Sequence, residues 1–86
     1  MRRIHRSDAN RAELVAFARA CGITVFDIGR PVDLLVIIRG EWFPVELKSK
    51  DGKYTDAQKE FIKTCDANNA PVLTWRTTDD IVEALQ

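Results

Sequence analysis

The 86-residue sequence has no net charge, because its 13 Lys and Arg residues balance its 13 Asp and Glu residues. The overall charge therefore does not indicate a nucleic-acid-binding protein. No apolar run is long enough to span a bilayer, and the basic N-terminus lacks the apolar segment of a signal peptide. The two cysteines, Cys21 and Cys65, have no metal-ligand spacing. We interpret them as small buried hydrophobic residues of a protein in the reducing cytoplasm.

The length fits one domain, residues 1–86, of which 1–6 would form a flexible basic arm. A domain of this size buries only about 60–65% of the surface that its unfolded chain exposes. Dimerisation would therefore help its stability. We see no internal repeat, low-complexity segment or interdomain linker.

Hydrophobic periodicity and turn residues predict helices and strands in the order α-β-β-β-α-β-α. The expected helices cover 8–21, 55–69 and 78–85, and the expected strands cover 23–28, 32–38, 41–48 and 71–75. A helical crossover between the third and fourth strands favours a mixed sheet. The predicted fold class is α/β, a small mixed β-sheet with flanking helices.

Capping residues support the helix boundaries. Ser7 or Asp8 can cap the first helix and Gly22 can end it. Thr55 and Gln58 have the spacing of a capping box at the second helix. The residues expected to face the core are Leu14, Val15, Phe17, Ala18 and Cys21 in the first helix, Phe61, Ile62 and Cys65 in the second, and Ile81, Val82 and Leu85 in the third.

A β-hairpin connected by Arg39-Gly40 is the most informative segment. A turn centred there pairs Val36 with Phe43, Leu34 with Val45 and Val32 with Leu47, which makes one face wholly apolar. On the other face Ile37 pairs with Trp42, Leu35 with Pro44 and Asp33 with Glu46. Pro44 would remove a ladder bond from a central strand, and a bulge there would shift the register.

The opposed pair Asp33 and Glu46 is unusual. Carboxylates about 5 Å apart repel each other, by roughly 3 kcal/mol at an effective dielectric near 20. A divalent cation would turn this repulsion into chelation. Lys48 lies on the same face and could orient a water beside the cation. Alternatively, Glu46 and Lys48 merely neutralise each other at a solvated end of the sheet.

Two groups of basic residues could contact phosphates. The first is N-terminal and contains Arg2, Arg3, His5, Arg6 and Arg11, and the second follows the hairpin and contains Lys48, Lys50 and Lys53. For any one of these residues, solvated surface charge is the more common outcome. For the single histidine, His5, a DNA contact or no role is favoured over catalysis.

The combined pattern resembles the PD-(D/E)xK nuclease superfamily, which has a restriction-endonuclease-like core. More narrowly, it is similar to the stand-alone VRR-NUC domains of phages and bacteria. The matching pieces span almost the whole chain: Asp8-Ala9-Asn10, Asp33-Leu34-Leu35-Val36, Glu46-Leu47-Lys48 and Thr55-Asp56-Ala57-Gln58. The Glu-x-Lys motif alone is a weak signal, but combined with the upstream Asp, the hairpin spacing and the downstream Gln at a helix start it is a fairly strong one.

The resemblance implies a metal-dependent DNA phosphodiesterase. Asp33 and Glu46, with the backbone carbonyl of Leu47, would bind Mg²⁺ or Mn²⁺, and the cation would polarise the scissile phosphate and activate a water. Lys48 would position the nucleophile or stabilise the developing charge. Gln58 would orient Lys48 or the substrate, or would serve only the capping box.

Some positions depart from the family pattern. The family's Gly-x-Pro-Asp is Gly29-Arg30-Pro31-Val32-Asp33 here, with an additional valine before the aspartate. A reshaped loop would make Asp27 an alternative acid. Asn10 and Glu13 are weaker candidates on the first helix, where Arg11 stands at a position that often carries Gln or Glu in the family.

The resemblance therefore favours an intracellular, phage- or bacterium-encoded endonuclease that acts as a homodimer on branched DNA such as a Holliday junction. The alternatives are a less selective nicking enzyme or exonuclease, an RNA substrate, and a DNA- or protein-binding module that keeps the fold without catalysis. The predicted DNA contacts are Arg2, Arg3, Arg6, Lys50 and Lys53.

Overall fold

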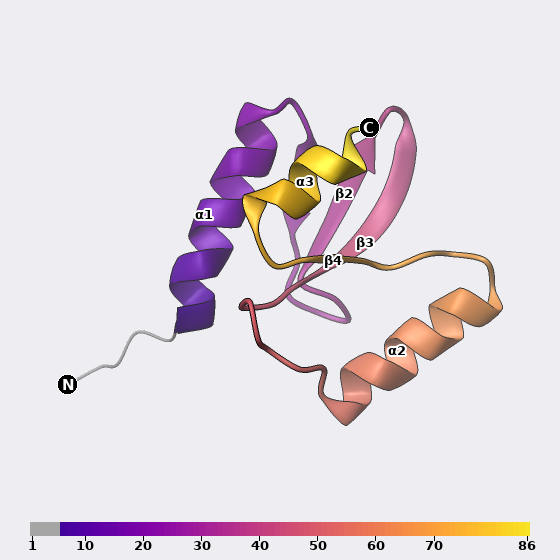
Figure 1. Ribbon diagram of the computed structural model, residues 1–86. Coiled ribbons are helices and arrows are strands. Elements are labelled where there is room, and N and C mark those ends of the chain that lie inside the picture. Colours follow the sequence, from indigo (N-terminus) through magenta and orange to yellow (C-terminus); the bar gives the residue numbers. More distant parts are fainter. Residues whose placement is uncertain (1–5) are drawn as a thin grey trace.

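The computed structural model describes residues 6–86 and confirms the predicted α-β-β-β-α-β-α order (Figure 1). Its elements are α1 (Arg6–Ala20), β1 (Thr24–Asp27), β2 (Leu34–Ile38), β3 (Glu41–Leu47), α2 (Asp56–Ala67), β4 (Leu73–Trp75) and α3 (Thr78–Ala84). The strands form one mixed sheet in the order β1-β2-β3-β4. The first three strands are antiparallel, and β4 runs parallel to β3.

The β2–β3 hairpin has the predicted register. Leu34 pairs with Val45, Val36 with Phe43 and Ile37 with Trp42. Arg39 and Gly40 both have positive φ, 52° and 81°, as the mirror-image turns that suit hairpins require. In each of these pairs both side chains face the same side of the sheet, and the pairs on one side are apolar. The alternation of apolar residues along the two strands therefore determines the register.

Pro44 causes no bulge, since it pairs in register with Leu35. The parallel ladder with β4 begins only at Val45. Pro44 therefore lies just beyond the end of that ladder, where its missing N–H interrupts no bond between β3 and β4.

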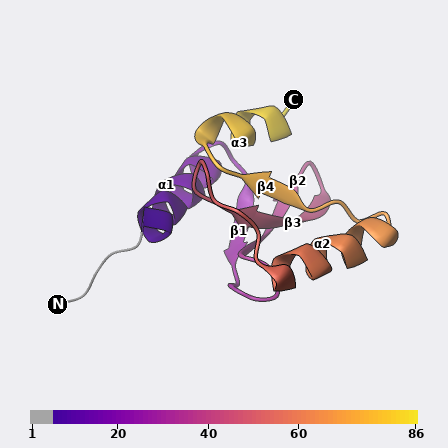
Figure 2. The same cartoon turned by 60° about the horizontal axis from the view of Figure 1, so that its bottom comes forward.

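Helices α1 and α3 cover one face of the sheet (Figure 2). Helix α1 packs against β1 and α3, and α3 packs against β4. The core between these layers consists of Leu14, Val15, Ala18, Ile23, Val25, Leu34, Val36, Ile38, Val45, Leu47, Trp75 and Ile81. The opposite face of the sheet, called the outer face below, carries Phe26, Leu35, Ile37, Trp42 and Pro44. These residues are exposed or half-buried.

Three expectations about the flanking elements are wrong. Helix α1 begins at Arg6, so Ser7 and Asp8 lie within the helix and not before its first turn. Of the expected arm, residues 1–5 lie outside the described part. Cys21 is exposed because it lies beyond the end of α1. Val82 is 41% exposed, whereas its neighbour Ile81 is fully buried.

Helix α2 begins as predicted but packs differently. Thr55 is its N-cap, and Thr55 and Gln58 form both bonds of the capping box. No residue of α2 is buried, and Phe61, Ile62 and Cys65 are only half-buried. The helix lies on the other side of the sheet from α1 and α3 (Figure 2), so its apolar stripe is not part of the core.

Among residues 6–86, no helix combines the length and the apolar character that crossing a membrane requires.

Candidate active site

Asp33 lies directly before β2, at the end of the loop that carries the additional valine. Val32 is 3% exposed, so the added side chain is buried. The carbonyl oxygen of Asp33 accepts hydrogen bonds from the backbone N–H groups of Ile28 (3.1 Å) and Gly29 (3.0 Å). The loop therefore closes on Asp33 itself, and Asp33 directly precedes Leu34, the first paired residue of β2.

The Asp33 carboxylate is held by β3 and by α1. Its Oδ2 accepts the backbone N–H of Leu47 at 2.8 Å, and its Oδ1 accepts a hydrogen bond from Arg11 Nη1 at 2.9 Å. Arg11 also forms an ion pair with Asp27, at the end of β1. These contacts fix the carboxylate between strands β1 and β3, next to the Glu46-Leu47-Lys48 segment.

Glu46 is the only buried charged residue in the described part of the chain, with 1% of its surface exposed. Its Oε1 accepts a long hydrogen bond, 3.4 Å, from Gln58 Nε2. Burial, together with hydrogen bonding to Asp33 and the negative charge of Asp33, raises the pKa of Glu46 to about 7. The Glu46 carboxyl therefore holds a proton under mildly acidic conditions and releases it near neutral pH.

Asp33 behaves in the opposite way. Burial acts to raise its pKa, but hydrogen bonds from Glu46, the Leu47 N–H and Arg11 outweigh burial and hold the pKa below the usual range. Two neighbouring carboxyl groups thus have their pKa values pushed apart, with Asp33 ionised and Glu46 available to lose a proton. Such pairs are common at functional sites.

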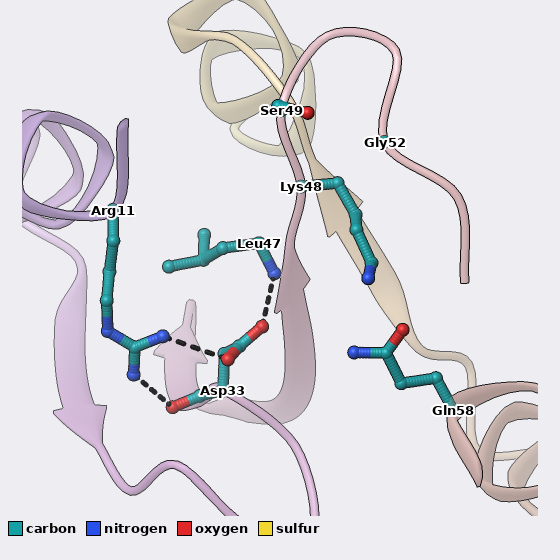
Figure 3. Close-up of a pocket in the computed structure, with 7 residues that line it drawn as sticks. All are labelled: Arg11, Asp33, Leu47, Lys48, Ser49, Gly52 and Gln58. Atoms are coloured by element: carbon teal, nitrogen blue, oxygen red, sulfur yellow. Dashed lines mark hydrogen bonds and ion pairs between the residues drawn. The ribbon is translucent and has the colours of Figure 1, made fainter. Parts of the chain in front are cut away.

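An open hollow of about 320 Å³ lies beside Asp33. Its lining residues are Arg11, Asp33, Leu47, Lys48, Ser49, Gly52 and Gln58. Figure 3 shows the side chains of Lys48 and Gln58 pointing towards Asp33 from one side of the hollow, while Arg11 reaches Asp33 from the other. The Lys48 ammonium also lies 5.6 Å from the centroid of the Tyr54 ring. Glu46 does not line this hollow, but it is hydrogen-bonded to Gln58, which does.

Gln58 forms the predicted capping box and in addition contacts Glu46. Its backbone N–H donates to Thr55 Oγ1 (3.1 Å), and its side-chain Oε1 accepts the Thr55 N–H (2.9 Å). The other end of the amide, Nε2, donates to Glu46. The capping box therefore aims the amide nitrogen at the buried carboxyl.

The remaining predicted residues are placed as follows. Asn10 donates to the backbone carbonyl of Lys48 at 3.0 Å, so it supports the strand end that carries the lysine. Glu13, Lys50 and Lys53 are exposed. Arg2, Arg3 and His5 lie outside the described residues, as does the side chain of Arg6.

Two arginines have structural roles that the sequence did not reveal. Arg11 was grouped with the basic N-terminal residues, but it faces Asp27 and Asp33. Arg76 donates to the carbonyls of Ser49 (2.9 Å) and Gly52 (2.7 Å) and so holds the loop that forms one wall of the hollow. No periodicity or spacing signals either contact, because both join segments far apart in the sequence.

The donor set fits a hard divalent cation. A cation would offset the repulsion between the buried Glu46 carboxyl, once ionised, and the neighbouring Asp33 carboxylate. Carboxylate oxygens are also ligands that Mg²⁺ prefers. Among residues 6–86, no group of three or more His, Cys, Asp or Glu side chains is placed to hold a metal ion. The protein would therefore supply two carboxylates, and a backbone carbonyl, waters and substrate oxygens would complete the shell, as Mg²⁺ sites commonly do.

Comparison with known proteins supports the fold. No protein-family model matches the sequence, and no curated protein matches it. A solved structure described as "VRR_NUC domain" superimposes with a TM-score of 0.76 at 21% sequence identity, covering 95% of this chain and 96% of that chain. The chain therefore has the fold of a VRR_NUC domain, as the resemblance in its motifs implied.

Proposed function

We propose that this protein is a divalent-metal-dependent nuclease that hydrolyses phosphodiester bonds in DNA. One observation carries the proposal. Asp33, Lys48 and Gln58 come from three separate segments and line one open hollow, and Gln58 is hydrogen-bonded to the buried Glu46. The shared fold with a VRR_NUC domain makes nuclease chemistry the first expectation for such a group of residues.

Asp33 and Glu46 would hold Mg²⁺ or Mn²⁺ together with the Leu47 carbonyl. When bound, the ion would polarise a phosphate oxygen and lower the pKa of a water. Asp33 is preorganised for this role by the Leu47 N–H and Arg11. Each of its oxygens can accept more than one bond, so these contacts leave room for a ligand bond. Glu46 would take up its role as it loses its proton.

Lys48 supplies the positive charge that faces the substrate. Its ammonium lies in the hollow beside Asp33, where it would position the attacking water or stabilise charge on the phosphate. Gln58 is a positioning residue, because its amide holds Glu46. Asn10 fixes the carbonyl of Lys48 and so the strand end from which the ammonium extends.

The finer proposal is a homodimer that acts on branched DNA. Phe26 and Trp42 stack on the outer face, with ring centroids 5.9 Å apart, and both are exposed. Exposed Ile28 and the half-buried stripe of α2 add further apolar surface. A two-fold dimer matches one such surface to the same surface on a second copy. Two copies would present two sites to a junction.

The second candidate is a DNA- or protein-binding module that does not cleave. The buried Glu46 and the pairing of Asp33 with Arg11 favour it, because both carboxyls are satisfied without a metal. The intact Lys48 in the hollow favours the nuclease, since a binding module has no need of an ammonium beside two carboxyls.

A cleavage panel separates the two candidates. Four-way junction, flap, duplex and single-stranded DNA, together with one RNA, are incubated with Mn²⁺ and the wild-type protein or Asp33→Asn. We expect Mn²⁺-dependent cleavage by the wild type, strongest on the junction, and none by the variant. Binding of the same DNA without cleavage by either protein would establish the binding module instead.

A further inference from the structure

Arg11 is the centre of an ion-pair group whose charge the proposed chemistry has not yet taken into account. Its Nη1 donates to Asp33 Oδ1 at 2.9 Å, and its Nη2 donates to the Asp33 carbonyl oxygen at 3.2 Å. Nη2 also pairs with the Asp27 carboxylate. The half-buried guanidinium thus bridges two carboxylates, one at the end of β1 and one directly before β2.

The position of Arg11 gives it two effects on Asp33. First, a planar guanidinium holds a carboxylate in a defined orientation, which aims Oδ2 at the Leu47 N–H. Second, the guanidinium places a permanent positive charge against Oδ1, since arginine stays protonated in proteins. Any cation that approaches Asp33 is therefore repelled by the positive charge of Arg11.

The charges around Asp33 can be counted. Asp27, Asp33 and Glu46 contribute three carboxyl groups, and Arg11 and Lys48 contribute two cations. With every group ionised, the formal charge of the group is therefore −1, which one divalent ion already overcompensates. Without Arg11 the charge would be −2, and Asp27 and Asp33 would face each other with no cation between them.

We propose that Arg11 is a positioning residue whose permanent positive charge lies against Asp33. Because of this charge, the site binds a single divalent ion, and it binds that ion more weakly than it would without the guanidinium. This proposal rests on the metal site of the proposed function. Arg11 lowers the metal affinity, but it also stabilises the metal-free site by neutralising Asp27 and Asp33.

The proposal predicts that two properties move in opposite directions when Arg11 loses its charge. In Arg11→Gln the melting temperature without metal falls, because two carboxylates lose their common partner. The affinity for Mn²⁺ rises about tenfold, because a positive charge next to Asp33 no longer repels the ion. This rise is expected whether or not the variant also binds a second ion. A residue with only a structural role would lower the stability and leave the affinity unchanged or weaker.

Two variants control the test. Arg19→Gln removes an arginine of the same helix, which donates to the backbone carbonyl of Val25 at 3.0 Å and not to a carboxylate. It should lower the melting temperature and leave Mn²⁺ binding unchanged. Arg11→Lys keeps the charge without the planar fork and should bind Mn²⁺ within about threefold of the wild type. It also carries the test if Arg11→Gln does not fold, because a tenfold gain in Arg11→Lys would contradict the charge argument.

The measurement is isothermal titration of the metal-free proteins with Mn²⁺, combined with their melting temperatures. One ion per wild-type chain and a tighter Arg11→Gln support the proposal. Wild-type binding with equal or weaker binding by Arg11→Gln overturns it and leaves the nuclease proposal standing. Binding by Arg11→Gln alone would contradict both proposals, because the wild-type site would then take no ion. Absence of binding in both proteins overturns both proposals.

Discussion

The side-chain amide of Gln58 reaches the buried carboxyl of Glu46, with Nε2 and Oε1 3.4 Å apart. The same amide completes the capping box at the start of α2 through its oxygen. The beginning of a helix and the candidate site are therefore joined in one side chain. Thr55 takes part in the same capping box but does not contact Glu46, so mutating each residue in turn separates the two roles.

Gln58→Ala and Thr55→Ala both remove part of the capping box and should each destabilise the protein by about 1 kcal/mol. Only Gln58→Ala removes the hydrogen bond to Glu46. We therefore expect a much larger loss of DNA cleavage in Gln58→Ala than in Thr55→Ala. Denaturant unfolding and cleavage rates of the two variants provide the comparison. Equal cleavage losses would mean that Gln58 acts only through the helix.

Lys48→Ala should abolish cleavage while Mn²⁺ and DNA binding persist, because its ammonium faces the hollow and the carboxyl ligands stay intact. Lys63→Ala, which removes an exposed lysine of α2, is the matched control. Cleavage by Lys48→Ala at the wild-type rate would remove the lysine from the mechanism.

The pKa of Glu46 predicts how the metal-free protein responds to pH. Its folded-state pKa of about 7 lies above the usual 4.5, so protonation favours the folded state. This stabilisation is complete below pH 4.5 and is lost as the pH rises through 7. At about 1.4 kcal/mol per pKa unit, we expect the free energy of unfolding to fall by roughly 3 kcal/mol over this range.

Glu46→Gln should flatten that pH dependence, as measured by denaturant unfolding in the presence of a chelator. Asp33 does not interfere, because its pKa is lowered and its contribution is lost only as the pH falls below its usual value of 3.8. An unchanged pH dependence in Glu46→Gln would assign the effect to another group.

The exposed stack of Phe26 and Trp42 predicts a dimer interface on the outer face. Trp42→Glu places a charge on this surface and should raise the dimer dissociation constant at least tenfold by sedimentation. Val82→Glu alters another exposed apolar residue, on α3, and should leave the dimer unchanged. A wild-type protein that is monomeric at micromolar concentration would contradict the dimer proposal.

Removing residues 1–6 should weaken DNA binding and lower its dependence on salt, because each lost phosphate contact reduces the logarithmic salt slope by about 0.9. The exposed pair Lys50 and Lys53 provides a second test as a double alanine variant. Binding isotherms at several salt concentrations give the slopes. If the truncated protein keeps the full slope, the N-terminal residues do not contact DNA.

Local patterns predicted the elements that depend on local physics. The alternation of apolar residues in β2 and the turn at Arg39-Gly40 gave the hairpin register. Thr55 and Gln58 gave the start of α2. The position of α2 could not be predicted in the same way, because an amphipathic stripe shows that a helix can pack but not which surface it meets.

The site was predictable in part for the same reason. Register brings Asp33 next to the Glu46-Leu47-Lys48 segment, so their approach follows from the hairpin. The contacts of Arg11 and Arg76 depend on how α1 and the segment after β4 pack on the sheet. From the sequence alone, neither arginine can be distinguished from the other charged residues, most of which are expected to be exposed to solvent.

The central claim is that Asp33 and Glu46 together hold one divalent cation. The most direct test is the melting temperature of the wild type, Asp33→Asn and Glu46→Gln, each with a chelator and with increasing Mn²⁺. Since a ligand of the folded state stabilises it, the account predicts a saturable rise in the wild type that both variants lose. A rise of the same size in either variant, or none in the wild type, would contradict the claim.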